Sequence, residues 1–296
     1  MSTDYQRTRT PYPMSWVNHR EIGPFYEGPV YIWDIDKTYL NTRFSQLKGL
    51  LRIPFELGVD KDAYPGVVAL LQGLREGPDG DQHCPLYFVS ASPRQIRDSV
   101  ERKMLLDGIE FDGLSFKDPL HLFMRGQFSQ LTEQIAFKLA ALVRLAGDLP
   151  DGAQCHLFGD DAEQDALIYS LFGDIIAGRL RGDDLLATLL ALGVRDVYCK
   201  KIVTAVAALP ARELVRSISI HLVRAADGAS IGGFGPHVSG YASAGAVASH
   251  LVREGLLGER SAQHVMAGSS PGEVVRGAVD ADPEGWLTPR SYRSGA

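Results

Sequence analysis

Two aspartates stand at the end of an apolar run, and this feature restricts the fold more than any other. The segment "VYIWDIDKTYLNT" spans residues 30–42, with Asp34 and Asp36 directly behind its apolar residues. An apolar run that starts at Gly28-Pro29 is typical of a strand buried on both faces of a parallel sheet. Burial gives no reason to place carboxylates at the tip of such a strand. The pair therefore predicts chemistry at the carboxyl edge of a sheet.

Further apolar runs predict more strands, and helical patterns lie between them. The predicted strands are "PVYIWDID" (29–36), "PLYFVSAS" (85–92) and "QCHLFGDD" (154–161), with weaker candidates at 113–118 and 194–202. The predicted helices are 65–76, 92–108 with Ser92 as its N-cap, and 131–147. Strands that alternate with helices predict a parallel sheet with helices on both faces. The expected fold is a three-layer, Rossmann-like α/β domain.

The character of the sequence changes at both ends of this pattern. Residues 1–27 are polar with several prolines and predict an irregular lead-in, and the α/β domain is expected over 28–205. Residues 206–258 predict a small C-terminal helical region, with two helices around the loop "GASIGGFGPH". Residues 259–296 are rich in Gly, Ala, Pro and Ser and predict a flexible tail.

Composition excludes several classes of protein. The net charge of −6 gives no electrostatic reason to expect nucleic acid as the main partner. Cys84, Cys155 and Cys199 form no CxxC pair, which fits thiols in a reducing compartment. The N-terminus lacks an apolar signal segment, and the longest apolar run, from Leu185, is shorter than the roughly 20 residues that cross a bilayer. We therefore expect a soluble, cytoplasmic protein.

Each strong strand ends in polar side chains. These are Asp34, Asp36 and Thr38 after the first, Ser90 and Ser92 in the second, and Gly159, Asp160 and Asp161 in the third. Ligands of open parallel sheets bind outside the carboxyl ends of the strands, so adjacent strands would bring these residues into one crevice. Carboxylates gathered there would repel one another unless a divalent cation lay among them, and oxygen ligands favour Mg²⁺ over zinc. The predicted ligands are Asp34, Asp36, Asp160 and Asp165, with Asp161 as an alternative.

A carboxylate cluster with Mg²⁺ suits phosphoryl transfer, and each residue has a separate predicted role in that reaction. Asp34 is the predicted nucleophile, and Asp36 would protonate the leaving group and then activate water. Ser90 would donate to a phosphoryl oxygen, and Lys138, on the third predicted helix, would supply a cation and keep the nucleophile ionised. The neighbouring residues Thr38, Ala91 and Ser92 are the predicted substrate-binding positions.

The order of these motifs resembles the haloacid dehalogenase superfamily of phosphatases over about residues 28–202. The motifs are "DIDKT", the serine that ends the second strand, the helix-borne Lys138 and "GDDAEQD". Within the superfamily, "YFVSASPRQI", "GLSFKD" and "HLFGDDAEQDALIY" are most similar to the catalytic domain of App1-type phosphatidate phosphatases. That branch usually has Asp at the position of Lys37, Asn at Ala91 and Ser-Gly at Asp161-Ala162; none of these departures removes a predicted catalytic group.

The resemblance implies an Mg²⁺-dependent phosphomonoester hydrolase that works through an aspartyl-phosphate. Asp36 points to phosphate esters, because halide leaves without a proton and the superfamily's dehalogenases lack this acid. We expect no large cap, only a small basic flap over 41–60, so that the open cleft takes a bulky or lipid phosphate with at most peripheral membrane contact. Two alternatives stay open: a phosphatase on nucleic-acid ends, bound through Arg43, Lys48 and Arg52, or a non-catalytic binding module.

Overall fold

The computed structural model describes most of the chain between residues 12 and 277. The described residues are 12–41, 62–118, 130–224, 231, 233–235, 237–270, 272 and 274–277. Nearly all of the expected basic flap, including Arg43, Lys48 and Arg52, lies outside them, as does part of the "GASIGGFGPH" loop.

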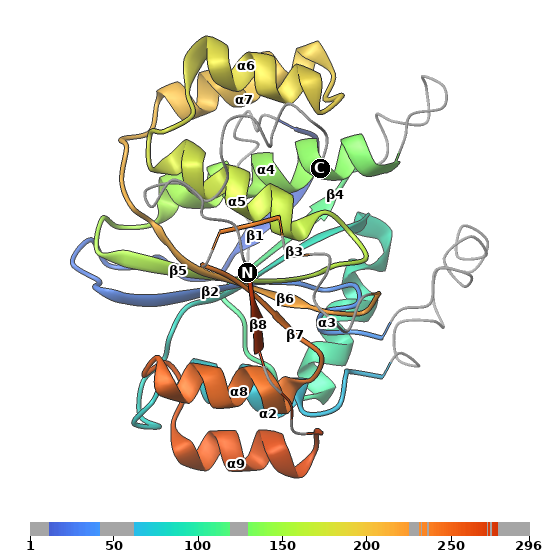
Figure 1. The fold of residues 1–296 in the computed structure, drawn as a ribbon, viewed down its shortest axis with the longest axis vertical. Helices are drawn as coiled ribbons and strands as arrows, with labels where there is room; N and C mark the ends of the chain where they lie inside the picture. Colours follow the sequence, from blue (N-terminus) through green and yellow to red (C-terminus); the bar gives the residue numbers. More distant parts are fainter. Residues whose placement is uncertain are drawn as a thin grey trace, which may run out of the picture.

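An eight-stranded mixed sheet runs through the middle of the molecule (Figure 1). In spatial order its strands are β1 (Met14–Asn18), β4 (Gly113–Lys117), β3 (Leu86–Pro93), β2 (Gly28–Asp34), β5 (Ala153–Asp160), β6 (Val215–His221), β7 (Val238–Tyr241) and β8 (Val274–Arg276). The edge strands β1 and β8 pair antiparallel with their neighbours, and all inner pairs are parallel. The strands of Asp34, Ser90 and Asp160 are therefore adjacent, with β2 in the centre, as predicted.

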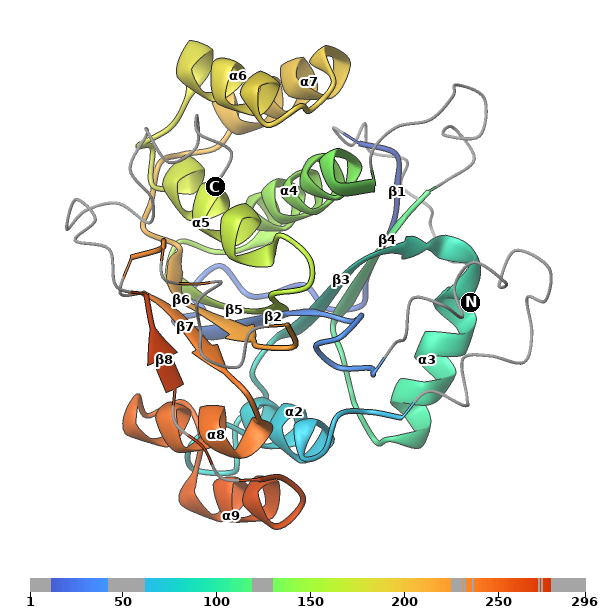
Figure 2. The ribbon, with the colours of Figure 1, turned by 45° about the vertical axis from the view of Figure 1, so that its right-hand side comes forward.

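Helices cover both faces of the sheet, which confirms the three-layer α/β prediction (Figures 1 and 2). One face carries α4 (Gln130–Asp148) and α5 (Asp165–Ile176), with α6 (Gly182–Ala191) and α7 (Asp196–Ala207) outside them. The other carries α2 (Val67–Glu76), the short η2 (Arg94–Ile96), α3 (Arg97–Leu106) and α8 (Ala244–Arg253), with α9 (Glu259–Ala267) outermost. Alternate residues of β2 supply both cores, because Ile32 packs toward α4 and Trp33 toward α2.

Two segments have the opposite structure to the one expected. Residues 206–258 are not mainly helical, since they contain β6 and β7 before α8. In β6 the isoleucines Ile218 and Ile220 alternate with small or polar residues and pack into the core under α4 and α5. The predicted strand over 194–202 is instead the start of α7, whose core-facing residues Tyr198 and Ile202 are four positions apart.

The described parts of the two flanking segments contain regular structure that the sequence does not predict. Residues 1–27 contain β1, which extends the sheet beside β4, and residues 259–296 contain α9 and β8. Ser92 is not a helix N-cap, because it lies within β3 and η2 starts after Pro93. Across the described ranges 62–118 and 130–152, between β2 and β5, there are helices and the strands β3 and β4 but no separate cap domain. Among the described helices, none combines the length and apolarity needed to span a bilayer.

Candidate active site

The carboxyl ends of β2, β3 and β5 meet at one place on the sheet. In the parallel registers Asp34 lies opposite Val89 of β3, and Trp33 lies opposite Phe158 of β5. Ser90 and Asp160 therefore end up on either side of Asp34, and all three side chains are buried. Strand order alone brings together residues that are far apart in the sequence.

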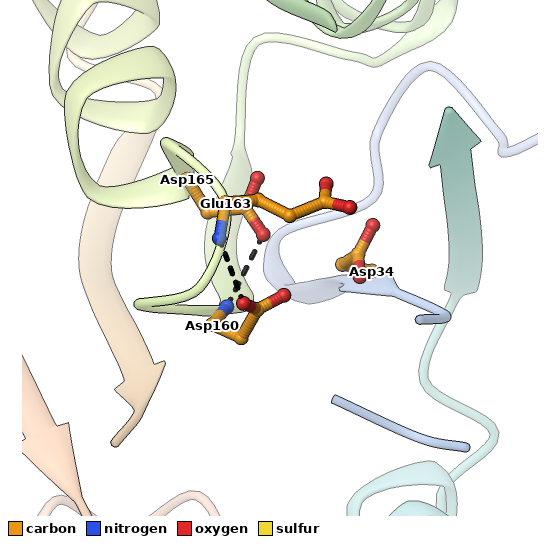
Figure 3. Close-up of side chains that lie close together, drawn as sticks. All are labelled: Asp34, Asp160, Glu163 and Asp165. Atoms are coloured by element: carbon orange, nitrogen blue, oxygen red, sulfur yellow. Dashed lines mark hydrogen bonds between the residues drawn. The ribbon is translucent and has the colours of Figure 1, made fainter. Parts of the chain in front are cut away.

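A cluster of carboxylates fills this position (Figure 3). Asp34, Asp160, Glu163 and Asp165 each place a carboxylate oxygen within 4.8 Å of the others. Figure 3 shows Glu163 reaching from the β5–α5 connection toward Asp34. Asp36, also predicted as a metal ligand, is not part of this cluster. Glu163 was not predicted, and its only signal in the sequence is its place between two predicted ligands in "GDDAEQD".

The β5–α5 connection folds around its own acidic side chains. Asp160 Oδ1 accepts hydrogen bonds from the backbone nitrogens of Ala162, at 2.6 Å, and Glu163, at 2.9 Å. Asp165 Oδ2 accepts one from the backbone nitrogen of Asp160 at 3.2 Å. A side chain at position 159 would collide with the carboxylate of Asp165, so Gly159 is needed for this close approach. The motif therefore sets the positions of its own ligands.

Lys138 joins the cluster from α4, as predicted. Its Nζ lies 2.9 Å from Asp34 Oδ1, 2.8 Å from Glu163 and 2.5 Å from Asp165, and its side chain is fully buried. Burial alone would lower the pKa of Lys138, but the three carboxylates outweigh it and raise the pKa above its ordinary value. Lys138 is therefore a permanent cation beside the predicted nucleophile.

One ammonium group does not balance the four carboxylates. Burial raises the pKa of Asp34, against the opposing effect of Lys138, and it raises the pKa of Asp160 to about 8. Oδ2 of Asp34 and Oδ2 of Asp160 are buried without a hydrogen-bond partner among the described residues. Four carboxylates gathered within 4.8 Å of one another, two of them with an unpartnered oxygen, fit a hard divalent cation, which would replace the protons that burial favours.

Asp36 faces the serines of β3. Its Oδ2 accepts hydrogen bonds from Ser92 Oγ at 2.6 Å and from Ser90 Oγ at 3.2 Å. Its Oδ1 is buried and has no hydrogen-bond partner within the described chain. One oxygen of Asp36 is thus held in place, while the other has no hydrogen bond to the described chain that would compete for a proton. Ser92 was predicted to bind substrate, whereas in the structure its hydroxyl group holds Asp36.

The remaining predicted residues lie near the cluster in different surroundings. Thr38 is buried, with no hydrogen-bond partner for its Oγ1 in the described ranges, and Ala91 is half-buried beside Ser90. Asp161 points away, since its Oδ1 accepts hydrogen bonds from the backbone nitrogens of Val223 at 2.7 Å and Arg224 at 2.9 Å. Asp161 therefore fixes the bend after β6, and of the two alternatives Asp161 and Asp165 only Asp165 joins the cluster.

A parallel sheet with an acidic cluster and a buried lysine at its carboxyl edge has the groups that phosphoryl-transfer enzymes need. The model of one family, the catalytic domain of phosphatidate phosphatase APP1, matches residues 30–180, slightly more than half of the chain. The chain belongs to this family, and it is a phosphatase, a hydrolase of phosphoric monoesters. No match was found among curated proteins or among solved structures.

Proposed function

We propose that the protein hydrolyses a lipid phosphomonoester of the phosphatidate type, with Asp34 as nucleophile and Mg²⁺ as cofactor. The observation that carries the proposal is the position of Asp34. One of its oxygens contacts Lys138, the other has no hydrogen-bond partner within the described residues, and the carboxylate belongs to the acidic cluster. A carboxylate placed in this way can attack an electrophile while its charge is stabilised.

The reaction runs in two steps through Asp34 and Asp36. Asp34 attacks the phosphorus, the bond from phosphorus to the ester oxygen breaks, and Asp36 gives its proton to the leaving alcohol. Water then attacks the phosphorus of the aspartyl-phosphate, Asp36 takes a proton from that water, and phosphate leaves with Asp34 regenerated. Ser90 and Ser92 keep Asp36 oriented through both steps.

The carboxylates of Asp34, Asp160 and Asp165 would hold the metal, together with Glu163. The cation supplies positive charge that offsets the negative charge of the phosphoryl group as it is attacked. Lys138 contributes further positive charge and fixes Asp34, Glu163 and Asp165 relative to one another. The choice of Mg²⁺ rests on the all-oxygen donor set.

The substrate class follows from the family, whose model describes a phosphatidate phosphatase domain. A lipid phosphate would be met at a membrane surface by peripheral contact, from the cytoplasmic side on the prediction made above. Phosphorylated nucleic-acid ends have no such support, and the basic residues proposed for them lie outside the described chain.

A substrate screen with two variants tests the proposal. The wild-type protein is expected to release phosphate from phosphatidate vesicles and from p-nitrophenyl phosphate with Mg²⁺, and to lose this activity reversibly in EDTA. Asp34→Asn should abolish both activities while the protein stays folded, as judged by its circular dichroism spectrum. Asp151→Asn, at an exposed carboxylate paired with Arg212, is the matched control and should keep full activity. Full activity in Asp34→Asn would refute the mechanism, and activity confined to small sugar phosphates would refute the lipid substrate.

A further inference from the structure

The backbone takes an unusual conformation directly after Asp36. Lys37 has a φ of 62°, in the left-handed region that residues other than glycine rarely adopt. That conformation is sterically unfavourable for a residue with a side chain and persists only where its surroundings hold it. One hydrogen bond that holds it is local, from the backbone nitrogen of Lys37 to the carbonyl of Leu40 at 2.8 Å.

A second hydrogen bond comes from the far side of the site. His221 Nδ1 lies 2.8 Å from the carbonyl oxygen of Lys37. Because a carbonyl can only accept, Nδ1 must carry the hydrogen, and this fixes the tautomer of the ring. His221 is the last residue of β6, where it lies opposite Asp160 of β5. The bond therefore links the segment directly after Asp36 to β6, the neighbour of the strand β5 that carries Asp160.

Two tyrosines hold the ring of His221 in place. Tyr64 meets it edge-on, with ring centroids 4.5 Å apart, and Tyr241 stacks on it at 5.4 Å and an angle of 20°. The histidine side chain is buried. A ring fixed in this way presents its Nδ1–H at one position, which suits it to hold a strained peptide.

We propose that His221 is a positioning residue for Asp36, the acid–base group of the reaction. If the bond to Lys37 is lost, the left-handed peptide relaxes, and Asp36 shifts relative to the ester oxygen that it protonates. The proposal rests on the function proposed above. His221 lies beyond the family-matched segment, 30–180, so the family match does not assign it a role.

Three variants separate the hydrogen bond from the packing of the ring. His221→Phe keeps an aromatic ring between the tyrosines and removes the donor. His221→Asn keeps a donor at the position of Nδ1, whereas His221→Gln places its amide at the position of Nε2. Each variant is assayed on phosphatidate, whose alkoxide leaving group needs a proton, and on p-nitrophenyl phosphate, whose leaving group is a weak base and needs little help.

His221→Phe and His221→Gln are expected to lose roughly tenfold more kcat on phosphatidate than on p-nitrophenyl phosphate, and His221→Asn should stay within about threefold of wild type on both. If His221 had a purely structural role, kcat would fall equally on both substrates, and His221→Asn would not restore it. Equal losses on the two substrates, or no loss in a folded His221→Phe, would overturn the proposal.

Hydrogen exchange gives a second readout that does not depend on activity. Backbone amides in residues 35–40 should exchange faster in His221→Phe than in wild type or His221→Asn, with other segments unchanged. Unchanged exchange in that segment would also overturn the proposal. If the wild-type protein hydrolyses neither substrate, the proposed function fails, and the exchange result still decides whether His221 holds the loop.

Discussion

The ammonium group of Lys138 lies 2.9 Å from Oδ1 of Asp34, and both side chains are buried. The two residues come from different layers of the fold, since Lys138 belongs to helix α4 and Asp34 to strand β2 of the sheet. A buried lysine is stable as a cation only where carboxylates surround it, and here three do so. The same contact therefore stabilises the fold and prepares the nucleophile.

Lys138→Met should damage both activity and stability. We expect kcat to fall by at least about 100-fold because the charge beside the phosphoryl group is lost. The free energy of unfolding should fall by roughly 3 kcal/mol, since a buried ion pair loses one partner. Phosphate release and urea denaturation measure the two effects. Lys117→Met, which breaks the ion pair between Lys117 of β4 and Glu133 of α4, is the control and should leave kcat unchanged. A fully active Lys138→Met protein would contradict this role.

Glu163 and Asp161 are close in sequence, but only Glu163 points into the acidic cluster. Variants of the two residues therefore serve as test and control for metal binding. Glu163→Gln should weaken Mg²⁺ binding by about tenfold, because it removes one anionic oxygen from the cluster. Asp161→Asn should leave the affinity unchanged, since that carboxylate binds the backbone after β6. Titration calorimetry with MgCl₂ measures both. Equal effects of the two variants would show that the cluster does not bind the metal as inferred.

The stability of the metal-free protein should depend on pH through Asp160. Its carboxyl group has a pKa of about 8 in the folded protein, against 3.8 for the ordinary group. Between these values the folded state holds a proton that the unfolded state has lost, so stability falls as pH rises from about 4 to 8. Mg²⁺ replaces that proton, and its effect on Tm should be larger at pH 8 than at pH 5. Calorimetry in EDTA and in Mg²⁺ tests this, and Asp160→Asn should reduce the pH dependence. A metal-free Tm that does not change over this range would contradict the prediction.

The ion pair between Arg75 and Asp112 should matter for stability alone. Both residues are buried at the amino end of the sheet, and Asp112 also accepts a hydrogen bond from the backbone nitrogen of Leu86 at 2.8 Å. Asp112→Asn leaves the Arg75 charge buried and should cost roughly 3 kcal/mol in urea denaturation, with kcat unchanged. Asp151→Asn breaks a pair with Arg212 in which the carboxylate is exposed, and it should cost less than about 1 kcal/mol. Similar costs for the two variants would argue against the special role of burial.

The residues at the strand ends could be predicted because two rules acted together. Apolar runs such as "PLYFVSAS" identify inner strands, and parallel strands place their carboxyl ends at one edge. Asp34, Ser90 and Asp160 follow from these rules without knowledge of any contact. Lys138 also follows, but only from its place in the order of the motifs, because a helical pattern alone does not single out one lysine. Glu163 lies in a connection without periodicity, so no pattern shows where its side chain points.

The errors in the C-terminal part have a physical cause as well. In β6 the serines Ser217 and Ser219 interrupt the apolar residues, so the segment lacks the continuous run that marks β2 and β5. The start of α7 has the opposite problem, since Val197 and Tyr198 favour strands by intrinsic preference while packing on α4 makes the segment helical. Tertiary context decides both segments. The sequence therefore predicts a helix around His221, whereas the structure places this residue at the end of strand β6.

The order of the strands has a consequence for how the chain is made. β5, which carries Asp160, is covered on its outer side only when β6 pairs with it, and β6 ends at His221, well past residue 180. During synthesis the half-built sheet presents β5 as a bare, apolar edge, which is the kind of surface that recruits other chains. A protein cut after residue 180 would therefore be expected to aggregate instead of folding into a smaller enzyme. All the catalytic motifs are therefore synthesised before the strand that the sheet needs to fold without an exposed edge.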